Sequence, residues 1–358
     1  MVKRLRIAQI APLWFSIPPK KYGGIERIVH FLTEELVKRG HKITLFASGD
    51  SKTSAKLVSV SPISLIKAKY SWQDPFWNLE NLSEAFSRAN KFDIIHSHLD
   101  LWTLPFQRLT KKPVLHTLHN QLYKASVIRE GEKKPTRIEI FKKHKKETNA
   151  VFISNSEKKQ SVIKFPNNWV VYNGIDISQF KFRAKPKNHF IWIARIDPFK
   201  GIENAIKAAE IAKVNLLLAG RLDSYRKDYF NKKIKPHLSK KIKYIGELSS
   251  KELSNFYGNA LGCLYPIEWE EPFGLIMTES MACGTPVIAF NRGSVKEIVK
   301  DGKTGFVVKN INEMVKAMKK IDKINRLDCR KRVEKHFSYQ KMVDNYERIY
   351  YSLISRKP

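Results

Sequence analysis

Short apolar runs recur along the chain, and between them lie longer segments whose apolar residues follow a helical spacing. Runs that are apolar at nearly every position are typical of parallel strands, which are buried on both faces. In the first half of the chain we predict strands at residues 6–10, 43–47, 57–60, 93–96, 113–117, 150–154 and 169–172. In the second half we predict strands at residues 189–194, 214–219, 243–245, 262–266, 287–290 and 305–308. This alternation predicts an α/β protein with a parallel sheet in each half of the chain, and such sheets bind ligands at the carboxyl ends of their strands.

A polar stretch without periodicity, residues 181–188, separates the two halves and is the predicted linker. We therefore place a first domain at residues 1–180 and a second domain at residues 189–337, sizes that are ordinary for single domains. The tail, residues 338–358, is predicted to be a helix because its apolar residues gather on one helical face. These apolar residues are Met342, Tyr346, Ile349, Tyr350 and Leu353.

The loop after the first predicted strand carries no G-x-G-x-x-G pattern, which counts against a dinucleotide-dependent dehydrogenase. The loop ends instead at Gly23 and Gly24, and a segment with helical spacing follows. Glycines at a helix start let the backbone approach a ligand closely, although a plain tight turn would also use them.

Two glutamates mark the stretch from residue 268 to residue 286. Glu271 precedes Pro272, which suits a first helical position, so a helix is predicted to begin near Phe273. Glu279 then lies about two turns inside the helix, and the two carboxylates would be roughly 10 Å apart. The backbone N–H groups that would face a phosphate at this helix start belong to Phe273, Gly274 and Leu275. This arrangement suits a nucleotide-diphosphate sugar, but a partner for the helix dipole and a solvated helix residue would also explain the two glutamates.

Two cations, Arg195 and Lys200, lie in the loop after the first predicted strand of the second half. A planar guanidinium and a compact ammonium beside a helix start suit two phosphates. In the first half, histidines occur in pairs at predicted strand ends. The pairs are His96 with His98 and His116 with His119. No carboxylate at ligand spacing accompanies them, so we do not predict a metal site.

The formal net charge of +32 implies either attraction to an anionic partner or a lysine-rich composition spread over solvated faces. We find no nucleic-acid-binding module and no basic stripe interleaved with aromatics, so a specific nucleic-acid partner is not predicted. The 42% of hydrophobic residues is enough for a substantial core, and the three cysteines lack paired spacing, which favours a reducing cytosol. The apolar run near the N-terminus is too short for a signal peptide or a membrane span, so we expect a cytoplasmic protein.

The stretch that contains both glutamates has the pattern E-x7-E, followed by a small residue, Gly, x, Pro and Val. This pattern closely resembles the signature of retaining glycosyltransferases of family 4, the glycosyl transferases of group 1. Three further segments resemble the same family: GG-x-E after the first strand, PVLHTLH at the fifth strand, and R-x4-K-G after the first strand of the second half. The resemblance covers nearly the whole chain. It implies the GT-B fold, in which two Rossmann-like domains face each other and a C-terminal helix crosses back to the first domain.

The resemblance also implies a role for each matching residue. Glu271 and His119 would hold the donor sugar, and Glu279 would contact the nucleotide ribose. Arg195 and Lys200 would clamp the diphosphate. The remaining donor-binding positions are Gly23, Gly24, Phe273, Gly274 and Leu275.

The reaction implied by the resemblance moves a sugar from a UDP- or GDP-linked donor to a hydroxyl acceptor, with retention of the anomeric configuration. The acceptor would be a glycan, a lipid-linked molecule or a small molecule in polysaccharide or glycolipid biosynthesis. Family members are generally independent of metal ions, and no cofactor is expected. Two alternatives stay open: a sugar-nucleotide epimerase of the same fold, and a non-catalytic basic protein that binds anionic membrane or nucleic acid.

A basic segment at residues 136–147 combines lysines with apolar residues. Its lysines are Lys142, Lys143, Lys145 and Lys146, and its apolar residues are Ile138, Ile140 and Phe141. Such a run is commonly a solvated helix. By the resemblance, the first domain is the acceptor-side domain and the second is the donor domain. In the first domain this segment would also suit peripheral contact with an anionic surface at the inner face of the membrane.

Overall fold

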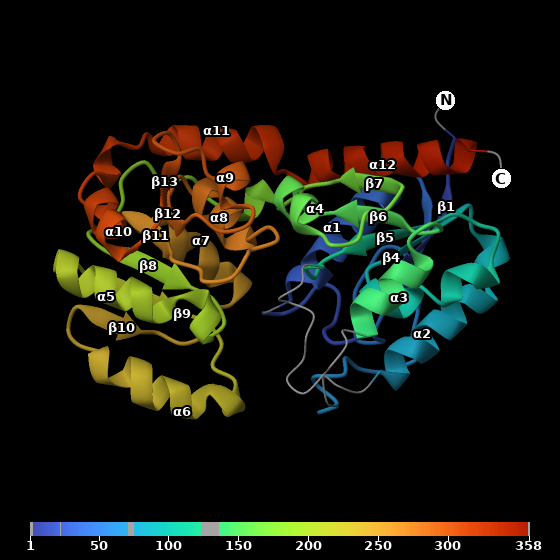
Figure 1. Ribbon diagram of the computed structural model, residues 1–358, viewed down its shortest axis with the longest axis horizontal. Coiled ribbons are helices and arrows are strands. Elements are labelled where there is room, and N and C mark those ends of the chain that lie inside the picture. The colour runs from blue at the N-terminus through green and yellow to red at the C-terminus, as the bar shows by residue number, and fades with distance from the viewer. Residues whose placement is uncertain (1–2, 22, 71–74, 123–135, 357–358) are drawn as a thin grey trace. The chain divides into compact units, whose positions relative to one another are not determined.

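The computed structural model describes residues 3–21, 23–70, 75–122 and 136–356, and it divides into two compact units (Figure 1). The first unit combines residues 1–174 with residues 339–358, and the second unit comprises residues 175–338. The chain therefore completes the second unit and then returns to the first unit for its last helix.

The described part of the first unit contains a seven-stranded sheet in the order β3-β2-β1-β4-β5-β6-β7, and all neighbouring strands are parallel. The strands are β1 (Arg6–Ile10), β2 (Lys42–Phe46), β3 (Lys56–Val58), β4 (Ile94–Ser97), β5 (Val114–Leu118), β6 (Asn149–Phe152) and β7 (Asn167–Val170). The helices are α1 (Gly24–Lys38), α2 (Phe76–Ser87), α3 (Thr136–His144), α4 (Asn155–Gln160) and α12 (Tyr339–Ser355). Strands β4 and β5 are buried at every residue, as expected when helices cover both faces of a parallel sheet.

The second unit contains a six-stranded parallel sheet in the order β10-β9-β8-β11-β12-β13. The strands are β8 (Phe190–Ile193), β9 (Leu216–Ala219), β10 (Ile242–Tyr244), β11 (Gly262–Tyr265), β12 (Val287–Phe290) and β13 (Gly305–Val308). The helices are α5 (Ile202–Ala212), α6 (Lys227–Tyr229), α7 (Ser250–Gly258), α8 (Leu275–Ala282), α9 (Val295–Ile298), α10 (Ile311–Met318) and α11 (Arg326–His336). Its core joins residues from β8, β9, α5 and α10, with Trp192 fully buried among them.

The predicted fold class is confirmed, because each predicted strand range overlaps a strand and the two sheets are parallel throughout. The predicted helix start near Phe273 needs correction, since α8 begins at Leu275. The cause is Gly274, which has a φ of 81° in the left-handed region and so precedes the helix as its N-cap.

The predicted linker at residues 181–188 lies within the second unit, and the division between the units falls at Gly174. Backbone hydrogen bonds explain this difference. The N–H groups of Lys181, Arg183 and Lys187 donate to Ser254 Oγ, the Cys283 carbonyl and the Asn259 carbonyl at 2.8, 3.0 and 2.6 Å. A polar stretch without periodicity is therefore held against the second unit by its backbone.

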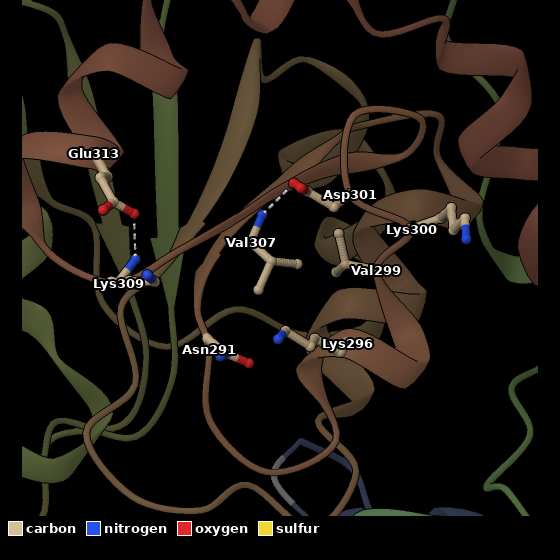
Figure 2. Close-up of a pocket in the computed structure, with 8 residues that line it drawn as sticks. All are labelled: Asn291, Lys296, Val299, Lys300, Asp301, Val307, Lys309 and Glu313. Atoms are coloured by element: carbon tan, nitrogen blue, oxygen red, sulfur yellow. Dashed lines mark hydrogen bonds between the residues drawn. The ribbon is translucent and has the colours of Figure 1, made fainter.

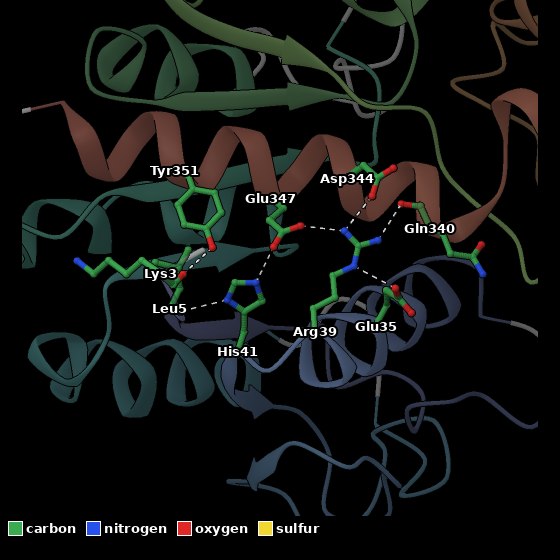
Figure 3. Close-up of polar contacts among 9 residues, drawn as sticks. All are labelled: Lys3, Leu5, Glu35, Arg39, His41, Gln340, Asp344, Glu347 and Tyr351. Atoms are coloured by element: carbon green, nitrogen blue, oxygen red, sulfur yellow. Dashed lines mark hydrogen bonds and ion pairs between the residues drawn. The ribbon is translucent and has the colours of Figure 1, made fainter. Parts of the chain in front are cut away.

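The last helix, α12, is fastened to α1 by a cluster of charged side chains (Figure 3). Arg39, which follows α1, has Nη1 2.8 Å from a carboxylate oxygen of Asp344 and 2.8 Å from one of Glu347, both on α12. Its Nε lies 3.0 Å from Glu35 on α1. One guanidinium thus joins three carboxylates from two helices that lie about 300 residues apart in the sequence.

Glu347 has a second partner in this cluster. His41 accepts the backbone N–H of Leu5 at its Nδ1 atom, so its Nε2–H donates to the other carboxylate oxygen of Glu347 at 2.8 Å. Desolvation raises the pKa of Glu347, but the hydrogen bonds from His41 and Arg39 outweigh it, and the net pKa lies below its ordinary value. The ionised form of Glu347 therefore stabilises the folded first unit.

We expect Glu347→Gln to lower the melting temperature at pH 7 and to have a smaller effect as the pH falls. The carboxylate contributes fully above its unfolded-state pKa of about 4.3, and the contribution is lost as the pH falls through the lower folded-state pKa. Because the side chains of Glu347 and Arg39 are partly exposed, the loss of unfolding free energy at pH 7 should be on the order of 1 kcal/mol. Thermal unfolding between pH 3 and pH 8 measures it, with the exposed Glu139→Gln in the same unit as control. An equal effect at pH 3 and pH 7 would contradict this assignment.

Candidate active site

Glu271 lies in the loop between β11 and α8, and 9% of its side chain is exposed. Its Oε2 atom accepts a hydrogen bond from the Tyr265 hydroxyl at 2.7 Å and from Trp269 Nε1 at 3.0 Å. The same oxygen lies 3.3 Å from Lys200 Nζ. A buried carboxylate is costly unless it is paired and hydrogen-bonded, and here three donors converge on one oxygen. The carboxylate is therefore held in one orientation.

Lys200 reaches Glu271 from the loop between β8 and α5, where it ends the short 3₁₀ turn η6 (Pro198–Lys200). Its backbone carbonyl accepts a hydrogen bond from Trp192 Nε1 at 3.1 Å, and Trp192 is a fully buried residue of β8. The Lys200 ammonium also lies 4.2 Å from the centroid of the Trp269 ring, a favourable cation–π distance. Both ends of Lys200 are thus fixed by tryptophans.

Arg195 lies in the same loop but has different partners. Its Nη2 atom is 3.8 Å from Asp197 Oδ2, and that oxygen also accepts a hydrogen bond from Arg226 Nη2 at 2.9 Å. Among the described residues, nothing accepts a hydrogen bond from the buried Arg195 Nε. One third of the Arg195 side chain is exposed, so the guanidinium keeps donors available for an anion.

The loop that carries Glu271 is held by the turn after β12. The backbone N–H of Ser294 donates to the Glu271 carbonyl at 2.9 Å, and Ser294 Oγ donates to the Phe273 carbonyl at 2.8 Å. Gly293 has a φ of 53°, and a Cβ atom there would lie 2.2 Å from the Glu271 carbonyl oxygen. Only glycine allows the two backbone segments to approach this closely.

Glu279 lies inside α8 and is 3% exposed. Its Oε2 atom accepts a hydrogen bond from the Tyr257 hydroxyl at 2.8 Å. Phe273 is buried, and its ring packs edge-on against Phe337, with 5.9 Å between centroids. Its side chain therefore anchors the loop before α8, while Gly274 caps that helix and Leu275 begins it.

Three predicted site residues belong to the first unit. His119 directly follows β5, is partly exposed, and has Nε2 2.9 Å from His98 Nδ1. Gly23 is the N-cap of α1, and Gly24 is its first residue. Among the described residues, no group of three or more His, Cys, Asp and Glu side chains is placed to hold a metal ion.

The structure brings Lys200 and Glu271 into direct contact, whereas Arg195 contacts Asp197 and Glu279 contacts Tyr257. The residues that orient these groups were not among the predicted site residues. They are Tyr257, Tyr265, Trp269, Asp197 and Arg226. Trp269 stands two positions before Glu271 in the same stretch, which was the one available signal; the two tyrosines resemble ordinary core residues.

A pocket of about 350 Å³ lies elsewhere in the second unit and contains none of the predicted site residues (Figure 2). Its lining residues are Asn291, Lys296, Val299, Lys300, Asp301, Val307, Lys309 and Glu313. Its two carboxylates accept backbone N–H groups, Asp301 from Val307 at 2.9 Å and Glu313 from Lys309 at 2.8 Å. These acidic groups are therefore engaged in holding the pocket wall.

The basic segment at residues 136–147 is only partly as predicted. Its four lysines are exposed, but Ile138 and Phe141 are buried in a core cluster of the first unit. The apolar residues therefore stabilise the fold, and only the lysines are placed to attract an anionic surface. Among the described residues, no helix is long and apolar enough to cross a membrane.

Two family models match the chain: glycosyl transferases group 1 over residues 175–336, and glycosyltransferase family 4 over residues 22–179. An uncharacterized 41.2 kDa protein in the cps region of Klebsiella pneumoniae is 29% identical over 315 residues, which cover 77% of this chain and 85% of the relative. Sucrose-phosphate synthase from Thermosynechococcus elongatus has a similar structure, with a TM-score of 0.82, 22% identity, and coverage of 98% of this chain and 100% of the other. Anabaena Alr3699/HepE in complex with UDP and glucose has a TM-score of 0.74 and 17% identity, covering 98% of this chain and 100% of the other.

We expect Gly293→Ala to destabilise the second unit more than Gly302→Ala does. Both glycines have a positive φ, so both variants carry the strain of a left-handed alanine, roughly 1 kcal/mol. Only at position 293 would the new Cβ also collide with the Glu271 backbone, since position 302 has no atom within 4 Å. The collision should cost roughly 1–3 kcal/mol more, measured as the difference in unfolding free energy. Equal losses in the two variants would show that the approach to Glu271 is not tight.

Proposed function

Because this chain belongs to the family 4 glycosyltransferases, the glycosyl transferases of group 1, we propose that it transfers a sugar from a nucleoside diphosphate donor to a hydroxyl acceptor with retention of configuration. The observation that carries this proposal is the contact between Lys200 and Glu271, at 3.3 Å. It places a cation suited to a phosphate directly beside a carboxylate suited to sugar hydroxyls.

The chemical difficulty of this transfer is the negative charge that develops on the departing diphosphate. Breaking the bond between the anomeric carbon and the phosphate oxygen leaves its electron pair on the diphosphate, where Arg195 and Lys200 would stabilise it. The new bond forms between the anomeric carbon and the acceptor oxygen on the same face, and the hydroxyl proton passes to the departing phosphate. No side chain is needed as a nucleophile in this scheme.

The hydrogen bonds to Glu271 suit a role in holding the sugar. Tyr265 and Trp269 orient its carboxylate independently of Lys200, so the orientation persists when the ammonium turns toward a phosphate. The tryptophan ring under Lys200 limits how far the ammonium can move. Because Glu271 does not depend on Lys200 for its orientation, the Lys200 ammonium can bind the diphosphate while the Glu271 carboxylate stays aligned with sugar hydroxyls.

In the same proposal Glu279, oriented by Tyr257, contacts the ribose, and His119 contacts the donor sugar from the first unit. We propose a UDP- or GDP-linked donor, and the UDP form is supported by the similar fold of Anabaena Alr3699/HepE, whose structure contains UDP and glucose. We further propose that no metal ion is required, because two cationic side chains are available for the diphosphate. A lipid-linked acceptor is compatible with the exposed lysines in the last turn of α3 and directly after it, whose attraction to an anionic membrane surface would be electrostatic.

We expect Arg195→Ala and Lys200→Ala each to slow transfer roughly 10²- to 10³-fold, because each removes one preorganised group that stabilises charge. Turnover of a panel of UDP- and GDP-linked sugars measures this, with Lys207→Ala on the exposed face of α5 as a matched control. The control should stay within about twofold of the wild type if local charge, not net charge, matters. Conversion of a donor to its epimer without an acceptor would instead favour the epimerase alternative.

Glu271 and Glu279 should respond differently to mutation. We expect Glu279→Gln to weaken binding of free UDP or GDP roughly tenfold, because its contact is with the ribose. Glu271→Gln should leave that affinity nearly unchanged and lower the turnover number, because its partner is the sugar. Isothermal titration with UDP and with GDP separates the two variants. Equal losses of nucleotide affinity would contradict the division of roles.

A further inference from the structure

A chain of hydrogen-bonded side chains runs through the interior of the first unit and ends at His119. Gln9 Nε2 on β1 donates to the hydroxyl of Tyr350 on α12 at 3.1 Å. His98 Nε2 lies 3.2 Å from Gln9 Oε1, and His98 Nδ1 lies 2.9 Å from His119 Nε2. Gln9, His98 and Tyr350 are buried, whereas His119 is partly exposed. His119 is therefore the member of the chain that a ligand can reach.

The chain continues on the other side of Tyr350. The Tyr350 hydroxyl lies 2.7 Å from His96 Nδ1, and His96 Nε2 lies 2.8 Å from Thr117 Oγ1. Thr117 Oγ1 is in turn 2.9 Å from the hydroxyl of Tyr346, also on α12. The hydroxyl groups of two tyrosines on the last helix thus hold the polar groups of the sheet in place.

The direction of each hydrogen bond follows from the groups involved. The Gln9 oxygen can only accept, so His98 Nε2 carries a proton and donates. A neutral His98 then has a bare Nδ1, which accepts from Nε2–H of His119. Beyond Gln9, the Tyr350 hydroxyl accepts a hydrogen bond from Gln9 Nε2 and so donates its own proton to His96 Nδ1.

All three histidines of the chain are held in the neutral form that this assignment needs. Desolvation is the largest cause and lowers the pKa of His96 and of His98 well below the ordinary value. Each also lies beside other histidines, whose charged forms would repel its own. Desolvation likewise lowers the pKa of His119.

We propose that Tyr350, Gln9 and His98 are positioning residues that hold His119 in its Nε2–H tautomer and leave its Nδ1 as a hydrogen-bond acceptor. Each hydrogen bond is donated toward α12: from His119 to His98, from His98 to Gln9 and from Gln9 to Tyr350. The acceptor at each step therefore fixes the proton position of the group that donates to it. Without them the two neutral tautomers of an imidazole are close in energy, and an exposed ring would populate both.

The consequence for the donor sugar rests on the proposed function, in which His119 contacts that sugar. A bare Nδ1 accepts a hydrogen bond from a sugar hydroxyl, but it offers no donor to a carboxylate. Sites built around one hydrogen-bonding pattern discriminate strongly against ligands that leave a buried group unpaired. The expected donor class is therefore a neutral hexose, and uronic acid donors should be poor substrates.

The test is histidine-selective ¹⁵N NMR of the whole protein, with the His119 resonances assigned from a His119→Asn variant. Tyr350→Phe removes one hydroxyl and leaves Gln9 Nε2 without its acceptor, so the amide is free to turn over. Gln9→Met breaks the chain at a second point. Tyr351→Phe is the matched control, because this neighbouring hydroxyl donates to the Lys3 carbonyl at 2.6 Å and takes no part in the chain.

We expect the wild type and Tyr351→Phe to show the Nε2–H form of His119, and Tyr350→Phe and Gln9→Met to show averaged shifts from both tautomers. An Nδ1–H form of His119 in the wild type would overturn the proposal, because it would mean that the hydrogen bonds run in the opposite direction. So would spectra of Tyr350→Phe and Gln9→Met that match the wild type.

The same variants are assayed for transfer with UDP-glucose, GDP-mannose and UDP-glucuronate. We expect Tyr350→Phe and Gln9→Met to slow transfer roughly threefold to tenfold, the effect of weakening one neutral hydrogen bond. A mixed tautomer with unchanged transfer would support the positioning role and contradict the sugar contact of His119. A wild-type preference for UDP-glucuronate would contradict the acceptor role of Nδ1.

Discussion

The burial of the Glu271 carboxylate is the constraint on which the arrangement of the second unit's site depends. Removing an ionised carboxylate from water costs several kcal/mol unless other groups replace the lost hydrogen bonds. Lys200, Tyr265 and Trp269 supply them. Lys200 lies in the loop after β8, Tyr265 is the last residue of β11, and Trp269 lies in the loop after β11. Satisfying one oxygen therefore ties the cation-bearing loop to the acidic loop. The close approach of Gly293 holds the acidic loop from its other side.

The strands could be predicted because a buried parallel strand is apolar on both faces, a pattern that survives without knowledge of neighbours. The start of α8 was predicted two residues too early, because Pro272 suits a first helical position and nothing local shows that Gly274 takes a left-handed conformation. Tyr265 and Tyr257 were missed for another reason. A tyrosine at a buried position predicts core packing, and its hydroxyl partner becomes known only when the fold brings Glu271 or Glu279 to it.

In the first unit, too, the partners of tyrosine hydroxyl groups could not be predicted, and here the partners lie farther apart in the sequence. The sequence placed His96, His98, His116 and His119 at the ends of strands, and parallel topology brings adjacent strand ends together. It assigned Tyr346 and Tyr350 to the apolar face of the last helix, which is correct for their rings. Their hydroxyl groups meet His96 and Thr117, which lie more than 200 residues earlier. Hydrophobic periodicity gives no information about such polar contacts, because it scores the ring and not the hydroxyl.

The last helix consequently contributes to polar geometry as well as to the core. A hydrogen bond loses most of its strength beyond about 3.5 Å, so a displacement of α12 by less than 1 Å would uncouple Tyr350 from Gln9. Arg39 resists such a displacement because it joins Asp344 and Glu347 to α1. A tautomer preference of about 1.4 kcal/mol at His119 would make one form tenfold more populated than the other. The ion pairs of Asp344 and Glu347 on α12 and the ring orientation of His119 at the carboxyl edge of the sheet are therefore linked through a single rigid helix.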